Sequence, residues 1–162
     1  MNKLMMLVSV VLLTGCGADR TKNKQATEDY SRLSIEQLTA KAESGDAVAQ
    51  LNLGFMNCQG ASGPQNYAEG VKWYRRAAEQ GQANAQFQLG CMYSRGEGVP
   101  EDVAKACKWL NLAAAGGIGE AMKLRVNLEK RMTPEQIAEG KKLSREFKPK
   151  PEAPIAPANK PQ

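Results

Sequence analysis

Histidine is absent from the 162-residue chain, and its absence removes several common kinds of chemistry. Without an imidazole there is no Ser-His or Cys-His pair for nucleophilic catalysis. An imidazole ligand for zinc, copper or haem is missing for the same reason. Enzymes can work without histidine, but the commonest catalytic base is missing. No catalytic residue, metal site or cofactor is predicted.

The start of the chain lacks an apolar run long enough to cross a bilayer. It contains a shorter apolar run instead. Leu4–Leu13 follows a single charge, Lys3, and is too short to span a membrane as a helix. A charged start, about ten apolar residues and a small-residue exit are typical of a secretory signal. The following Leu13-Thr14-Gly15-Cys16 resembles the bacterial lipobox. This resemblance implies that residues 1–15 are removed and that Cys16 carries a covalent lipid.

A lipid on Cys16 would anchor the protein in the bacterial cell envelope, because two or more acyl chains bind a membrane stably. Gly17, rather than aspartate, follows the cysteine. By analogy with lipoprotein sorting in enteric bacteria, this favours the outer membrane over the inner membrane. The alternative is an ordinary signal peptide that contains a cysteine.

A large excess of one charge is also missing. The chain has 22 Lys and Arg against 17 Asp and Glu, and its sequence pI is about 9.1. Basic and acidic residues are interspersed and only 6% of residues are aromatic, so no aromatic and basic surface for nucleic acid is predicted. The basic residues near the C-terminus suit attraction to acidic envelope components; they are Lys141, Lys142, Arg145, Lys148 and Lys150.

An internal repeat organises the centre of the chain. Identical residues recur 36 positions apart, as in Gly54 and Gly90 or Trp73 and Trp109. Other pairs of this kind are Gln50 and Gln86, Leu53 and Leu89, Pro64 and Pro100, Ala77 and Ala113, and Gly81 and Gly117. A period in the mid-thirties with two apolar stretches separated by a turn predicts stacked helical hairpins. The repeats cover about residues 46–81 and 82–117, with helices at 46–58, 66–80, 82–94 and 101–115.

The second repeat carries a family resemblance. Residues 85–102, Ala-Gln-Phe-Gln-Leu-Gly-Cys-Met-Tyr-Ser-Arg-Gly-Glu-Gly-Val-Pro-Glu-Asp, followed by Lys105-Ala106, Trp109 and Ala113-Ala114, resemble a Sel1-like repeat. The resemblance implies an all-α fold, a short right-handed solenoid of helix-turn-helix repeats with N- and C-terminal capping helices. It also implies protein-protein contact as the function.

Capping segments on both sides of the repeats complete one domain at 34–147, and a flank lies on each side of that domain. An N-terminal cap at 34–45 opens with a capping box at Ser34 and Gln37, and a C-terminal cap covers 118–147. The C-terminal cap contains a degenerate third unit, because Arg125 and Val126 stand where the second repeat has Leu89 and Gly90, and then a last helix with a capping box at Thr133. This organisation predicts seven helices. Residues 16–33 are expected to be a flexible tether and residues 148–162 a disordered proline-rich tail.

The predicted partner-binding surface consists of four polar residues, two on the first helix of each repeat. They are Asn52 and Gln59 in the first repeat and Gln88 and Arg95 in the second, at matching positions. The first helices of such repeats line the usual binding side of a solenoid. A solvated helix face is the alternative interpretation.

Cys91 and Cys107 lie on the two helices of one expected hairpin, at similar distances from its turn. Some Sel1-like proteins staple their hairpins with disulfides, so this pair is a possible bridge. Both positions also suit buried apolar side chains, and two buried thiols are the favoured prediction. Cys58 is expected to be an unpaired thiol.

These observations predict a monomeric, non-enzymatic, lipid-anchored scaffold of the bacterial envelope that binds an unidentified envelope protein and no nucleic acid. One alternative is a hydrolase or modifier acting on cell-wall material or β-lactams, which the sequence does not equip with a nucleophile and base. Another alternative is a surface-exposed lipoprotein that binds a host factor. Protein-protein interaction is the function that the repeats favour.

Overall fold

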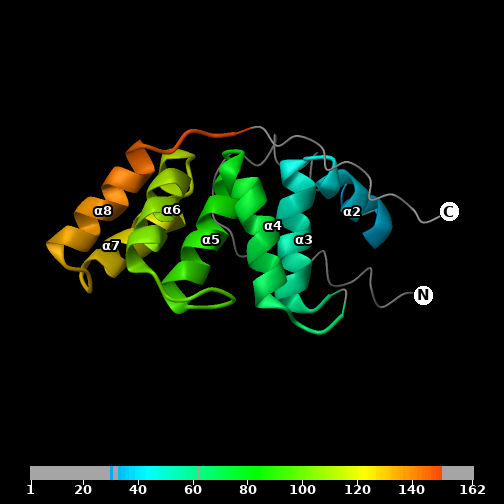
Figure 1. Cartoon of the computed structure of the whole chain (residues 1–162), viewed down its shortest axis with the longest axis horizontal. Coiled ribbons are helices and arrows are strands. Elements are labelled where there is room, and N and C mark those ends of the chain that lie inside the picture. Colours follow the sequence, from blue (N-terminus) through cyan, green and yellow to red (C-terminus); the bar gives the residue numbers. More distant parts are fainter. Residues whose placement is uncertain (1–29, 31–32, 62, 151–162) are drawn as a thin grey trace.

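The protein is an all-helical solenoid over the part that the computed structural model describes, residues 30, 33–61 and 63–150. Figure 1 shows its helices stacked side by side along one axis. Seven helices are assigned in this part: α2 (Ile35–Glu43), α3 (Ala47–Gln59), α4 (Tyr67–Glu79), α5 (Ala83–Arg95), α6 (Val103–Ala115), α7 (Gly119–Glu129) and α8 (Pro134–Arg145). The predicted helix-turn-helix solenoid is confirmed. No described helix is long and apolar enough to cross a membrane.

The helices begin and end where local sequence dictates. Both predicted capping boxes form, with the Ser34 and Thr133 side chains accepting from backbone amides three residues later. Asp46 caps α3 by accepting from the backbone N–H of Val48 and Ala49. Equivalent glycines, Gly60 and Gly96, end α3 and α5 in the left-handed conformation. The first helices of the two hairpins therefore end in the same way.

Within each hairpin, a large side chain of the second helix fills a space left by a glycine of the first. A Cβ on Gly54 would lie 2.5 Å from Cδ1 of Tyr74, and one on Gly90 would lie 2.9 Å from Cγ of Leu110. Tyr74 and Leu110 are themselves 36 positions apart and fully buried. The matched glycines therefore set how closely α3 and α5 approach α4 and α6.

Buried glutamines tie one hairpin to the next. The amide of Gln50 donates to the carbonyl of Ala42 at 2.9 Å, and that of Gln86 donates to the carbonyl of Ala78 at 3.1 Å. Each carbonyl lies in the last turn of the preceding helix and also accepts from the backbone N–H of the turn glycine that follows, Gly45 or Gly81. Since both glutamines are buried, these bonds are costly to leave unmade and orient successive hairpins.

The C-terminal end departs from the repeat geometry. The helix α8 packs against α6, whereas a third hairpin would pair it with α7. A Cβ on Gly140 would lie 2.7 Å from Cβ of Cys107, so α8 approaches α6 closely. The side chain of Asn111 on α6 donates to Ser144 on α8. As a result Val126, at the position of Gly54 and Gly90, is 43% exposed on α7.

Candidate protein-interaction surface

The four predicted partner-binding residues lie on α3 and α5, at the side of each helix that faces away from the core. Gln59 and Arg95 are exposed, and Asn52 and Gln88 are half-buried. The amide of Asn52 donates to the carbonyl of Val48 at 2.9 Å, one turn earlier in its own helix. This bond engages the Asn52 amide nitrogen within α3 and leaves the amide oxygen as the group for a ligand.

Each pair of polar residues shares one helical face. Seven positions separate Asn52 from Gln59 and Gln88 from Arg95, which corresponds to about two helical turns. The Arg95 guanidinium lies 3.7 Å from the Glu97 carboxylate, with 63% of the arginine side chain exposed. A pair so exposed contributes little to stability, so Arg95 is available to an incoming acceptor.

Large apolar residues neighbour these polar residues along α3 and α5. Leu51, Phe55 and Phe87 are partly buried and pack against the main core cluster, leaving one edge of each accessible. Protein interfaces commonly combine an apolar centre with a polar rim. We call these apolar residues and the four predicted polar ones the α3–α5 surface: Leu51, Asn52, Phe55, Gln59, Phe87, Gln88 and Arg95.

Sequence reasoning missed the apolar part of this surface. A signal was present, because Leu51 and Phe87 are 36 positions apart and each precedes one of the predicted polar residues. These apolar residues were given no role from the sequence, although a helix packed on one side leaves the flanks of its apolar stripe partly accessible.

The three cysteines of the described residues are free thiols and buried. Cys91 and Cys107, between which the sequence left a bridge open, are two separate buried thiols in the structure, the arrangement that the sequence favoured. Cys107 instead faces Gly140 of α8, and Cys58 faces Gly70 of α4. Burial raises the pKa of all three thiols above the usual cysteine value. They are therefore protonated at neutral pH and poor nucleophiles.

We expect Cys58, Cys91 and Cys107 to react with a thiol reagent at least about a hundredfold more slowly in the folded protein than in denaturant, because modification requires local opening. Mass spectrometry of a Cys16→Ser protein treated with iodoacetamide measures this. A Gln59→Cys variant supplies an exposed thiol on α3 that reacts quickly in the folded state. Rapid labelling of any buried thiol at the rate of position 59 contradicts the assigned burial.

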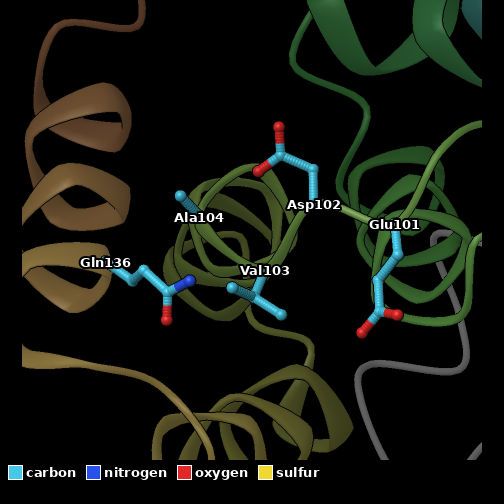
Figure 2. A pocket seen from close by; sticks show the side chains of 5 residues that line it. All are labelled: Glu101, Asp102, Val103, Ala104 and Gln136. Carbon is cyan, nitrogen blue, oxygen red and sulfur yellow. The ribbon is translucent and has the colours of Figure 1, made fainter.

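A shallow pocket of about 400 Å³ lies where α6 and α8 begin, lined by Glu101, Asp102, Val103, Ala104 and Gln136. In Figure 2 the carboxyl groups of Glu101 and Asp102 point in opposite directions. Asp102 caps α6 by accepting from the Lys105 amide and pairs with the Lys105 ammonium at 2.8 Å. Burial opposes ionisation of Asp102, but the bonds to Lys105 outweigh it and lower its pKa. Asp102 thus serves the start of the helix, and the Glu101 carboxylate instead lies 3.7 Å from the Arg131 guanidinium.

Among the residues that the structure describes, no group of three or more Cys, Asp or Glu side chains is placed to hold a metal ion.

The repeated hairpins and their matched glycines define a helical-repeat solenoid. Solenoids of this kind present a binding surface on the first helix of each hairpin, where the polar residues lie. Residues 47–82 and 83–118 each match the Sel1 repeat. This central part of the chain therefore consists of two Sel1 repeats, offset by one residue from the boundaries predicted from the sequence.

Two solved structures support this assignment. A protective antigen of uropathogenic Escherichia coli with an SLR fold aligns over 89% of this chain with a TM-score of 0.68 and 28% identity. A Sel1 repeat protein from Oxalobacter formigenes aligns over 58% with a TM-score of 0.57 and 39% identity. The chain covers 29% and 27% of those two proteins, respectively.

A curated protein also matches part of the chain. The secretory immunoglobulin A-binding protein EsiB of Escherichia coli O6:H1 is 45% identical over 45 residues. The match covers 28% of this chain and 9% of the relative. The chain therefore spans less than a third of the length of each of these three relatives.

Proposed function

We propose that this protein is a non-enzymatic, lipid-anchored scaffold of the bacterial envelope that binds a partner protein through the α3–α5 surface. The observation that carries the proposal is this surface itself, where half-buried apolar side chains lie beside outward amide groups and an exposed guanidinium. Such a combination suits a protein ligand, because apolar contact supplies affinity and the polar rim supplies orientation.

Two further considerations support a scaffold. Sel1-repeat proteins are in general scaffolds for protein-protein interaction. The three thiols outside the lipobox have raised pKa values, which argues against a cysteine nucleophile. The carboxylates at the start of α6 are engaged in capping and ion pairing.

The partner surface is tested by reversing its charge. A Gln88→Glu, Arg95→Glu double variant is expected to capture the partner from solubilised envelopes at least about tenfold less efficiently than wild type, because it places negative charge on the rim. Lys72→Glu on α4 is the control, since Lys72 is 68% exposed and lies on the other helix of the hairpin. Equal capture by wild type and the double variant, each folded by circular dichroism, contradicts the proposed surface.

The lipid anchor is tested at Cys16, which lies outside the residues that the structure describes. We expect wild-type protein to fractionate with membranes, with the outer-membrane fraction favoured, and Cys16→Ser protein to be released as a folded helical protein. Removing the acylated sulfur removes the acyl chains, and with them the stable anchor. A Cys16→Ser protein that stays in the membrane pellet, or that loses its helical spectrum, contradicts this proposal.

A second candidate is a surface-exposed lipoprotein that binds a host protein. The segment shared with EsiB favours it, because that relative is named for binding secretory immunoglobulin A. Protease treatment of intact cells separates the two candidates. Degradation of the protein places it at the outer surface, whereas protection until the outer membrane is opened supports a periplasm-facing scaffold.

A further inference from the structure

The residues that follow α8 run back across the ends of neighbouring helices. Figure 1 shows this segment passing above α6 and α5 towards α4. Phe147 packs edge-to-face on Trp109 of α6, with ring centroids 5.5 Å apart. Three residues later, the backbone N–H of Lys150 donates to the carbonyl of Glu79, the last residue of α4, at 2.9 Å. Residues 148–150, which were expected to begin a disordered tail, thus contact the repeat domain.

Pro149 lies on a glycine of the turn between α4 and α5. Gly81 has a φ of 94°, and a Cβ built there would lie 3.6 Å from Cβ and Cγ of Pro149. The equivalent turns carry Gly45 and Gly117 with φ values of 97° and 92°. Each turn between hairpins therefore presents a backbone surface without a side chain, and the proline ring lies against the one at Gly81.

A lysine and two aromatic rings form the other end of the contact. The Lys108 ammonium lies 4.2 Å from the ring centroid of Trp109 and 5.3 Å from that of Phe147. A cation over an aromatic face is attracted by the ring quadrupole, more strongly when partly desolvated. Burial lowers the pKa of Lys108, opposed by the Glu79 carboxylate. We call Glu79, Gly81, Lys108 and Trp109 the α4–α6 edge.

The contacts at this edge need only three groups from the segment that makes them. They require one aromatic ring, a proline two positions later and a backbone N–H on the next residue. An extended peptide supplies these groups whether or not it is joined to α8. Proline favours that extended form and reduces the entropy lost on docking.

We propose that the α4–α6 edge is a binding site for an extended peptide segment with an aromatic residue followed two positions later by proline, and that residues 147–150 occupy it in the free protein. This site is separate from the α3–α5 surface, because it is formed by the second helices and the turns. The tail holds the site through its tether, which gives an effective concentration on the order of millimolar. A partner segment of the same chemistry binds when it displaces the tail.

The test uses a synthetic peptide with the sequence of residues 145–152, Arg-Glu-Phe-Lys-Pro-Lys-Pro-Glu, added to the purified full chain. A Phe147→Ala variant loses the ring that anchors the tail and so vacates the edge. We expect the peptide to bind this variant at least about tenfold more tightly than wild type, because the wild-type site is mostly occupied. The indole signal of Trp109 and the amide signal of Gly81 in nuclear magnetic resonance spectra report the binding.

Two more variants make the result specific. Lys150→Pro removes the N–H that Glu79 accepts without touching the ring contact, and it is expected to increase peptide binding as well. It also carries the test if Phe147→Ala fails to fold. Lys148→Ala changes an exposed side chain of the same segment and is expected to behave as wild type. Equal peptide affinity for wild type and the folded tail variants, or no saturable binding to either variant, overturns the proposal.

Discussion

Replacing Leu110 with alanine is expected to lower the free energy of unfolding by about 2–5 kcal/mol, a large fraction of the stability of a small domain. Leu110 is fully buried and fills the space beside Gly90, at the centre of the second hairpin. The substitution removes apolar burial and leaves a cavity that helices packed at this distance cannot close. Urea denaturation followed by circular dichroism measures the loss.

Combining Leu110→Ala with Gly90→Ala, on the other side of the contact, tests whether the loss of stability comes from that contact. Gly90→Ala alone is expected to cost about 1–3 kcal/mol, because its Cβ would lie 2.9 Å from Cγ of Leu110. In the double variant the new methyl group enters the cavity. Its loss in free energy of unfolding should therefore be at least about 0.5 kcal/mol smaller than the sum of the two single losses. Gly119→Ala is the control, since no atom lies within 4 Å of its added Cβ. Strict additivity of the two changes contradicts a direct glycine-leucine contact.

Gly98→Ala is expected to cost about 2–5 kcal/mol through two separate effects. Gly98 has a φ of 71°, where a Cβ is strained by about 1–2 kcal/mol. The added Cβ would also lie 2.5 Å from the backbone carbonyl carbon and oxygen of Tyr67, at the start of α4. Backbone atoms cannot rotate aside as a side chain can, so the turn or the helix has to shift, which adds about 1–3 kcal/mol.

Gly117→Ala separates these two effects. Gly117 also has a positive φ, 92°, but nothing lies within 4 Å of its added Cβ. It should therefore show the conformational cost of about 1–2 kcal/mol alone. Thermal and urea unfolding of both variants give the difference, which measures the contact between the α5–α6 turn and α4. Equal costs at the two positions show that the Tyr67 contact contributes nothing.

The fold was predictable wherever short-range sequence determines it. The capping boxes at Ser34 and Thr133 use residues three positions apart, so they form as the sequence predicts. The 36-residue offset predicts the hairpins because each repeat solves the same packing problem with the same residues. The number and order of the helices followed from these two signals.

The packing of the C-terminal end was not predictable in this way. The caps of α8 are local, but its choice of α6 as neighbour depends on Gly140 meeting Cys107 across more than thirty residues of sequence. Proline-rich composition predicts disorder, yet Pro149 packs against Gly81, which is far away in the sequence. Such tertiary contacts override local composition.

The candidate surface was predicted in part. Repeat symmetry placed Asn52 and Gln88, and likewise Gln59 and Arg95, at matching outward positions of α3 and α5. Helical periodicity assigns large apolar residues to the core, so it missed the accessible edges of Leu51 and Phe87. The exposed fraction of these side chains depends on how far the next hairpin covers the helix. This coverage is a property of tertiary packing, which helical periodicity does not give.

Binding of a partner protein at the α3–α5 surface is measured by photo-crosslinking in cells from position 88. Position 72 on α4 is the comparison, because its side chain is exposed and free of the tail contacts that Lys108 makes. If the partner binds this surface, a discrete protein adduct forms mainly from position 88 and is identified by mass spectrometry. The same adducts in equal yield from both positions, or discrete adducts from position 72 alone, would contradict binding at this surface.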